Sequence, residues 1–208
     1  IDAAQNAVVI GAGFIGCEVA ASLSSQGIDV TIVEPASTPL ALALGPRIGA
    51  LVTRMHEANG VTVCTGVGVA EIVAGEGGAV REIKLDDGSV LPADLVVAGI
   101  GSTPVTDYLD GSDIELAPRE VGGGIACDAQ GRTSVPGVYA VGDVANWLDD
   151  AGDPRRVEHW NHTVEQAAVV AADITGGEGA TAAVPYFWSD QFDLKIQVLG
   201  DPRADDDV

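Results

Sequence analysis

Apolar runs and helix-patterned segments alternate along the first third of the chain. Residues 7–10 are all apolar, with the length and β-branched content of a buried strand. After a glycine-rich turn, Ile15, Val19 and Leu23 recur every four residues, which places one apolar stripe along a helix that Gly27 ends. The pattern therefore predicts a strand, a turn and a helix whose apolar stripe packs against a sheet.

The alternation continues to residue 63. Residues 29–34 predict a second strand, residues 47–59 a helix closed by Asn59-Gly60, and residues 61–63 a third strand. A βαβαβ order with short connections is typical of a parallel, doubly wound sheet. We therefore expect an α/β fold.

The apolar runs between residues 67 and 91 are short and closely spaced. Residues 67–73, 79–85 and 89–91 are short strand-like runs separated by Gly-rich or Asp-Gly turns, which predict an antiparallel meander. Residues 95–98 form another apolar run that returns the chain to the main sheet. The expected architecture is a Rossmann-like, doubly wound domain with an antiparallel β meander inserted in it.

The turn between the first strand and the first helix is Gly11-Ala12-Gly13-Phe14-Ile15-Gly16. In a Gly-x-Gly-x-x-Gly turn the first glycine permits the tight bend, the second lets backbone approach a pyrophosphate, and the third lets the helix pack on the strand. The positive end of the helix then faces the phosphates. Glycines also occur in ordinary strand-to-helix turns, so the spacing alone does not decide between a ligand site and a structural turn.

Glu34 adds a second observation to this turn. It follows Gly16 by 18 residues and ends the second predicted strand. A carboxylate there accepts hydrogen bonds from both hydroxyls of an adenosine ribose and repels a 2′-phosphate. We therefore expect a dinucleotide site, with NAD favoured over NADP.

Two further strand ends carry glycine. Gly99-Ile100-Gly101 follows the predicted strand at residues 95–98. Ligands of open α/β sheets bind beyond the carboxyl ends of the strands, so this turn is a candidate ligand site. A loop without a ligand is the alternative. Residues 137–143 predict an apolar strand that ends in Gly142-Asp143. The Asp143 carboxylate could bind sugar-alcohol hydroxyls or cap a helix.

A helix is predicted to begin at Thr163, which has capping-box spacing to Gln166, and to end at a Gly-Gly pair. Just before it, His159 and His162 offer two metal-ligating side chains, but no cysteine or further histidine nearby in sequence completes a ligand set. Trp160 could cover a planar ligand at the start of this helix, or it could lie in the core.

Three of the nine aromatic residues fall in the tripeptide Tyr186-Phe187-Trp188, ahead of a strand-like alternation over residues 194–198. The default interpretation of this cluster is a plug between domains. The three cysteines, Cys17, Cys64 and Cys127, lie in apolar stretches without a Cys-x-x-Cys pair. They are predicted to pack in the core.

The chain has 31 acidic and 10 basic residues, for a net charge of −21. Nucleic acids and anionic membranes both require clustered positive charge, so this balance argues against either as a partner, and Arg155-Arg156 is left as a candidate local basic patch. A lysine-poor, acidic surface fits a salt-rich cytoplasm, although a GC-rich genome also depletes lysine. Without an apolar run near ~18 residues or a signal-peptide pattern, a cytoplasmic protein is expected.

The order of these motifs resembles that in the FAD-dependent ferredoxin reductases that serve bacterial oxygenases. These reductases, the putidaredoxin reductase type, belong to the pyridine nucleotide-disulfide oxidoreductase superfamily. The resemblance covers nearly the whole chain. Its most specific parts are GAGFIGCEVA at 11–20, VYAVGD at 138–143, EHWNHTVEQA at 158–167 and PYFWSDQ at 185–191.

Members of this family have a separate FAD-binding Gly-x-Gly-x-x-Gly turn upstream and a further domain downstream. Because the present chain starts at Ile1, only a few residues before the first strand, the resemblance implies a partial chain. It implies an NAD-binding domain at 1–115, the C-terminal half of a FAD-binding domain at 116–180, with the junction near 110–122, and the start of a C-terminal α+β domain at 181–208.

The resemblance also implies residue roles in binding NADH. Glu34 would hold the adenosine ribose, and Glu18 would lie near the nicotinamide together with Gly99, Ile100 and Gly101. Where the family often has an arginine shortly after the residue matching Glu34, this chain has Ser37-Thr38-Pro39. The residues implied to hold the pyrophosphate are Gly11, Gly13, Ile15 and Gly16, and Phe14 is expected among the cofactor-binding residues.

For FAD, the resemblance implies that Asp143 binds the ribityl or pyrophosphate part, and Gly142 is expected among the cofactor-binding residues. Trp160 would lie beside the flavin ring, with the following helix aimed at its N1/C2 carbonyl edge, and His159 is expected among the cofactor-binding residues. A helix N-terminus there favours the negative charge that appears on reduction.

The implied reaction is transfer of hydride from NADH to FAD and of single electrons onward to a [2Fe–2S] ferredoxin or a rubredoxin. The cofactors carry the chemistry, so no side-chain acid or base is nominated. Two alternatives stay open: an NADH oxidase or disulfide reductase on the same scaffold, and a dinucleotide-binding module without enzymatic activity. A homodimer is also left open.

Overall fold

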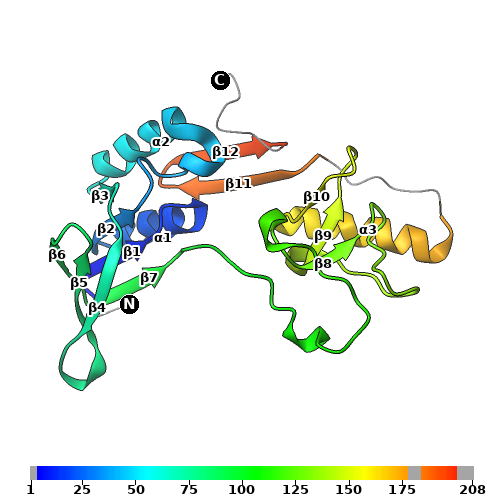
Figure 1. Ribbon diagram of the computed structural model, residues 1–208. Helices are drawn as coiled ribbons and strands as arrows, with labels where there is room; N and C mark the ends of the chain where they lie inside the picture. Colours follow the sequence, from blue (N-terminus) through cyan, green and yellow to red (C-terminus); the bar gives the residue numbers. More distant parts are fainter. Residues whose placement is uncertain (1–3, 178–183, 201–208) are drawn as a thin grey trace. The chain divides into compact units, whose positions relative to one another are not determined.

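The computed structural model describes residues 4–177 and 184–200 of the 208-residue chain (Figure 1). These residues form two compact units. The first unit contains residues 4–101 and 188–196, and the second contains the rest of the described residues. Each unit has its own hydrophobic core.

The helices and strands occur in the order β1 Asn6–Ile10, α1 Phe14–Ser25, β2 Asp29–Glu34, α2 Ala41–Ala58, β3 Thr62–Thr65, β4 Val69–Ala74, β5 Val80–Leu85, β6 Val90–Pro92, β7 Leu95–Ala98, β8 Ile125–Cys127, β9 Ala145–Leu148, β10 Pro154–Arg155, α3 Trp160–Thr175, β11 Tyr186–Gln191 and β12 Leu194–Leu199. Short 3-10 helices are η1 Glu76–Gly78, η2 Asp107–Leu109, η3 Arg119–Val121 and η4 Gly142–Val144. None of the helices in the described part of the chain is both long and apolar enough to cross a bilayer.

The first unit is built on a four-stranded sheet with the strand order β3-β2-β1-β7. All of its strand pairs are parallel, as the βαβαβ alternation predicted. The run at 95–98 pairs directly with β1, so the predicted return of the chain to the main sheet is confirmed. This strand order is that of a Rossmann-like, doubly wound sheet.

Successive residues of β1 point to opposite faces of the sheet, and each face meets a different layer. Ala7 and Val9 pack in a core with residues of α1 and α2, including Cys17. Val8 lies on the other face, in a core with Ile83 of the meander. The main sheet is therefore covered by helices on one face and by strands on the other.

The strands on that second face are β4, β5 and β6, which form an antiparallel sheet in the order β4-β5-β6. This sheet confirms the predicted meander. Ile83 of its central strand is fully buried, and Cys64 of β3 packs partly buried against the same core. With Cys17 and Cys127 buried, all three cysteines contact hydrophobic cores, as predicted.

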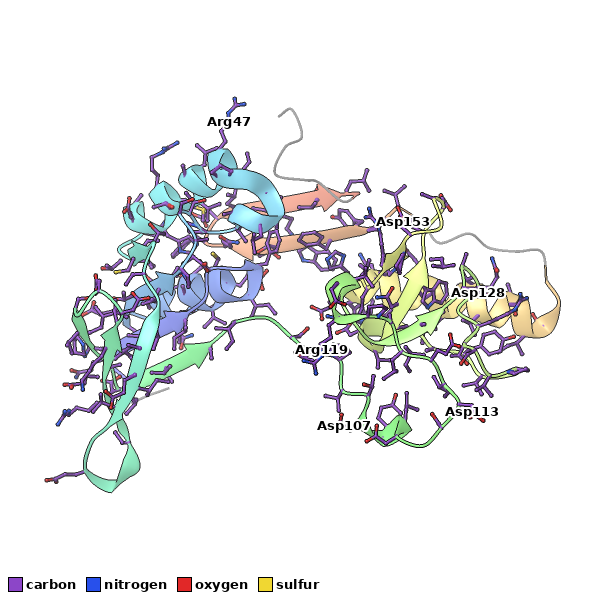
Figure 2. The ribbon with its side chains drawn as sticks, in the orientation of Figure 1. Arg47, Asp107, Asp113, Arg119, Asp128 and Asp153 are labelled. Carbon is purple, nitrogen blue, oxygen red and sulfur yellow. The ribbon has the colours of Figure 1, made fainter. Side chains whose placement is uncertain are left out.

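Helix α2 starts earlier than the predicted 47–59. Its residues up to Leu44 form an extra turn, because Gly45 has φ 74° and Pro46 follows it. A proline fits the first turn of a helix but not its interior, so the main part of α2 begins at this kink. Figure 2 shows Arg47, the next residue, projecting outward from the helix.

The second unit combines a three-stranded sheet, β10-β9-β8, with helix α3. β8 and β9 are parallel, and β10 is antiparallel to β9. Trp147 of β9 lies at the centre of the core, 4% exposed, and its indole N–H donates to the Ala140 carbonyl at 2.9 Å. The acidic side chains labelled in Figure 2 belong to different segments of this unit: Asp107 begins η2, and Asp113, Asp128 and Asp153 lie on loops.

Two sequence predictions in the second unit are wrong. Residues 137–143 are not a strand but a loop, in which Tyr139 makes one isolated bridge to Arg132 and Gly142 starts η4. Helix α3 begins at Trp160 rather than at Thr163, so no capping box forms. Thr163 instead lies inside the helix, where its N–H donates to the His159 carbonyl at 3.1 Å.

A buried polar contact joins α2 to β11 within the first unit. His56 is fully buried, and its Nε2 lies 3.1 Å from the side-chain oxygen of Gln191, which is also fully buried. The Gln191 amide donates to the Ser189 hydroxyl at 3.0 Å, so its oxygen accepts from His56. Burial lowers the pKa of His56 below its ordinary value, and the bond to Gln191 only partly offsets this shift.

This burial predicts a loss of stability in mild acid. Because the pKa of His56 is lower in the folded than in the unfolded chain, protonation favours the unfolded chain, so the stability is complete above about pH 6.5 and falls as the pH drops below it. The free energy of unfolding, measured with urea, should decrease from about pH 7.5 to about pH 5.5. In His56→Gln, which cannot titrate, the decrease should be smaller; parallel pH curves for the two proteins would contradict this account.

Candidate functional site

The glycine turn of the first unit lies at the carboxyl edge of the main sheet. β1 and β7 are parallel neighbours that end at Ile10 and Ala98, so the turns that follow them meet at this edge. The Gly99 N–H donates to the Ile10 carbonyl at 2.7 Å, and the Gly11 N–H donates to the Val33 carbonyl at 2.8 Å. The structure therefore brings together the two glycine turns that the sequence placed at strand ends.

Two of the three glycines are required by the packing of the protein itself. Gly11 has φ +96°, and a Cβ there would lie 2.4 Å from the Gly99 carbonyl oxygen. A Cβ at Gly16 would lie 2.0 Å from the Gly11 carbonyl oxygen. Any side chain at either position would therefore displace backbone.

Gly13 is different. It precedes the first residue of α1, is exposed, and a Cβ there would meet no atom within 4 Å. Its φ of −70° suits any residue, so the fold does not require glycine here. Open space therefore lies in front of Gly13, beside the N-terminus of α1, and we call this space the cradle. Helix N-termini of this kind bind phosphates in other proteins, and a side chain at Gly13 would obstruct one here.

The Glu34 carboxylate points into this same turn from the end of β2. One oxygen accepts from the Ala12 N–H at 2.7 Å, and the other accepts from the Ala36 N–H at 2.8 Å. The sequence placed Glu34 beside the turn but gave no sign of these backbone contacts.

The other predicted residues of this site lie around the turn. Ile15 and Ile100 are 69% and 76% exposed, which is unusual for large apolar side chains and leaves both free to cover a flat ligand. Phe14 and Glu18 are half-buried on α1, and Gly101 is exposed with φ +95°.

Cys17, one turn into α1, carries no chemistry here. Burial, together with the charges of Glu34 and Glu18, raises its pKa to about 12. The thiol therefore stays protonated at neutral pH and acts as a core residue.

In the second unit, the Gly142-Asp143 segment is held by its backbone. The buried Gly142 N–H donates to the side-chain oxygen of Gln166 on α3 at 2.7 Å, and the Asp143 carbonyl accepts from Arg156 Nη1 at 2.8 Å. The backbone of this segment is therefore fixed on both sides, and the Asp143 side chain is exposed, so its carboxylate is accessible to a ligand.

Arg156 is a residue whose role the sequence did not reveal. Its side chain is 10% exposed, so it is not part of a basic surface patch, and Arg155 pairs with Asp149 at 2.9 Å. Besides Asp143, Arg156 donates to the Gly122 carbonyl through Nε at 2.8 Å and pairs with Glu158, which also accepts from the Ser102 hydroxyl. Burial raises the pKa of Glu158, but the bonds from Ser102 and Arg156 outweigh burial and lower it overall.

The aromatic residues before α3 have different surroundings. Trp160 is 76% exposed at the first position of the helix, so it does not lie in the core. The His159 ring lies 4.3 Å from the Phe187 ring, and burial lowers the pKa of His159. Within residues 4–177 and 184–200, no three His, Cys, Asp or Glu side chains are arranged to hold a metal ion.

Comparisons with known proteins show which family this chain resembles in sequence and fold. The chain is 37% identical over 206 residues to a 5,5′-dehydrodivanillate O-demethylase ferredoxin reductase subunit of Sphingobium sp., covering 98% of this chain and 49% of that protein. It is 38% identical to a monodehydroascorbate reductase of Pisum sativum, covering 93% and 45% respectively. The chain thus spans about half the length of the curated relatives it matches.

A solved complex is also similar. The reductase in the covalent putidaredoxin reductase–putidaredoxin complex matches with a TM-score of 0.88 and 32% identity, over 94% of this chain and 46% of that chain. The family model of the pyridine nucleotide-disulphide oxidoreductases matches residues 2–167. The chain therefore belongs to the pyridine nucleotide-disulphide oxidoreductase family.

Proposed function

We propose that this chain is the NADH-binding part, and a portion of the FAD-binding part, of a reductase that passes electrons from NADH through FAD to a small iron–sulfur protein. The observation that carries the proposal is the open cradle at Gly13, flanked by two glycines that the fold requires and by the Glu34 carboxylate. The chemistry that the two cofactors supply when bound is hydride transfer followed by release of single electrons.

Residues of the first unit would bind and orient NADH. Gly11, Gly13 and Gly16 would admit its pyrophosphate, Glu34 its adenosine ribose, and Ile15 and Ile100 would exclude water from the nicotinamide. Phe14, Glu18, Gly99 and Gly101 complete the proposed NADH-binding set.

Residues of the second unit would bind part of FAD. The anchored Gly142 and the free carboxylate of Asp143 fit a hydroxyl-rich ligand, and Trp160 and His159 fit a flat ring beside the start of α3. Since the chain spans about half of its relatives, we expect FAD to be retained only by the full-length gene product. We further propose domain limits at 115 and 180, a cytoplasmic location, and a second copy of the chain as a further partner.

The electron acceptor is proposed to be a [2Fe–2S] ferredoxin or a rubredoxin, since one similar protein is named a ferredoxin reductase subunit and another is solved with putidaredoxin. The test is steady-state oxidation of NADH by the full-length gene product with ferredoxin, rubredoxin, monodehydroascorbate, a disulfide or oxygen as acceptor. The highest kcat/KM is expected with an iron–sulfur protein. A higher value with monodehydroascorbate, a disulfide or oxygen would refute this acceptor.

Trp160 offers a test of the proposed flavin position. Replacing Trp160 with Ala in the full-length gene product should change flavin fluorescence and slow reduction by NADH, because an exposed ring that stacks on the flavin also quenches it. Trp160→Phe should restore most of both properties. Tyr108→Ala, which removes another exposed aromatic ring of the same unit, is the control; equal effects of Trp160→Ala and Tyr108→Ala would place Trp160 away from the flavin.

A further inference from the structure

The glycine turn is fixed at Ala12 from two directions. The Ala12 N–H donates to Glu34 at 2.7 Å, and the Ala12 carbonyl accepts from the Leu40 N–H at 3.0 Å. Leu40 itself is well anchored, because its side chain is 4% exposed. Both peptide groups that flank Ala12 therefore have fixed orientations.

The orientation of these peptides decides where the N–H of Gly13 points. Ala12 and Gly13 share one planar, trans peptide group, so the Gly13 N–H points away from its carbonyl and hence away from Leu40. Because open space surrounds the Cβ position of Gly13, we place the proposed pyrophosphate on the side that this N–H faces. The Leu40 contact fixes this Ala12–Gly13 peptide directly, whereas Glu34 fixes the preceding Gly11–Ala12 peptide and so restrains the Gly13 N–H through the backbone of Ala12.

The Glu34 carboxylate has enough acceptor positions to hold the backbone of the turn and to bind the ribose at the same time. Each of its oxygens accepts one backbone N–H, from Ala12 and from Ala36, and a carboxylate has about four acceptor positions in total. The remaining positions suffice for the two hydroxyls of a ribose. A glutamine in its place would turn an N–H₂ donor toward one of the two backbone N–H donors and leave that pair unsatisfied.

We infer that Glu34 is a positioning residue for the pyrophosphate turn in addition to its proposed contact with the ribose. This inference rests on the proposed function, since it concerns the same dinucleotide site. Its consequence is that the choice of cofactor and the order of the turn depend on one carboxylate, so replacing Glu34 to admit NADP also weakens the binding of phosphates.

The test separates the two roles by removing the ribose hydroxyls from the ligand. ADP and 2′,3′-dideoxy-ADP are titrated calorimetrically into the FAD-loaded full-length gene product, with Glu34→Gln as the variant. A residue that contacts only the ribose would leave the affinity for dideoxy-ADP unchanged in Glu34→Gln. We expect instead that dideoxy-ADP also binds about tenfold more weakly, the effect of one lost charged hydrogen bond. The matched control is Glu57→Gln, an exposed carboxylate on α2, which should change neither affinity.

A second measurement examines the turn without ligand. Amide hydrogen exchange at Ala12 should be faster in Glu34→Gln than in the wild type, and unchanged in Glu57→Gln. Unchanged exchange at Ala12, or an unchanged affinity for dideoxy-ADP, would overturn the inference. If the wild type binds neither nucleotide, the proposed function fails, and Ala12 exchange then decides alone whether Glu34 positions the turn.

Discussion

Gly16→Ala is expected to abolish dinucleotide binding and to destabilise the first unit by about 3 kcal/mol. The added Cβ would lie 2.0 Å from the Gly11 carbonyl oxygen and 3.1 Å from its carbon. Neither atom belongs to a flexible side chain, so the helix must move away from the turn or the turn must unfold. The turn also packs against the turn that follows β7, because a Cβ at Gly11 would strike the Gly99 carbonyl oxygen. A shift at Gly16 therefore disturbs both glycine turns.

The matched control is Gly13→Ala. Since a Cβ at Gly13 meets no atom within 4 Å and its φ is −70°, this variant should fold with nearly wild-type stability. It should nevertheless bind NADH poorly, because the methyl group would occupy the phosphate cradle. The measurements are urea unfolding and NADH titration of both variants. Undiminished NADH binding by Gly13→Ala would show that the cradle is not the phosphate site.

Arg156→Ala is expected to lower the stability of the second unit by about 2–3 kcal/mol and to reduce the FAD content of the full-length gene product. The Arg156 guanidinium, on a side chain that is 10% exposed, donates to the carbonyls of Gly122 and Asp143 and to the carboxylate of Glu158. Its removal leaves these acceptors without their charged donor. The segment that carries Asp143 then keeps its contact with Gln166 but loses the one with Arg156.

The neighbouring arginine supplies the control. Arg155→Ala removes a partly exposed ion pair with Asp149 and should cost at most about 1 kcal/mol. Arg156→Lys keeps the charge but has no planar fork of donors, so it should restore only part of the FAD content. FAD content and urea unfolding are compared across the three variants. Equal effects of Arg155→Ala and Arg156→Ala would contradict a positioning role for Arg156.

The apolar pattern predicted the main sheet well because its two central strands, β1 and β2, are largely buried. Residues 7–10 are continuously apolar, since Val9 faces the helices and Val8 faces the meander. The meander was recognisable from its Gly and Asp-Gly turns, and the position of Glu34 from its distance to Gly16.

The errors in the second unit occurred where residues make long-range contacts instead of the local contacts that their spacing suggested. Residues 138–141 resemble a strand in composition, but Ala140 packs in the core and its carbonyl accepts from Trp147, which holds the segment as a loop. Gln166 looked like a capping residue, yet its side chain reaches Gly142. Contacts of this kind join residues far apart in the chain, so spacing could not indicate them. The domain limits and the cofactor roles of the named residues stay predictions.

The central claim is that this chain supplies the NADH site of a flavoprotein reductase. Its most direct test is an anaerobic titration of the full-length gene product with NADH and with NADPH, followed at the visible absorption of the flavin. We predict a visible flavin band that one equivalent of NADH per flavin bleaches. NADPH should bleach the same band much more slowly than NADH does, because the Glu34 carboxylate repels a 2′-phosphate. Absence of a flavin band, or a band that NADH does not bleach, would contradict the account.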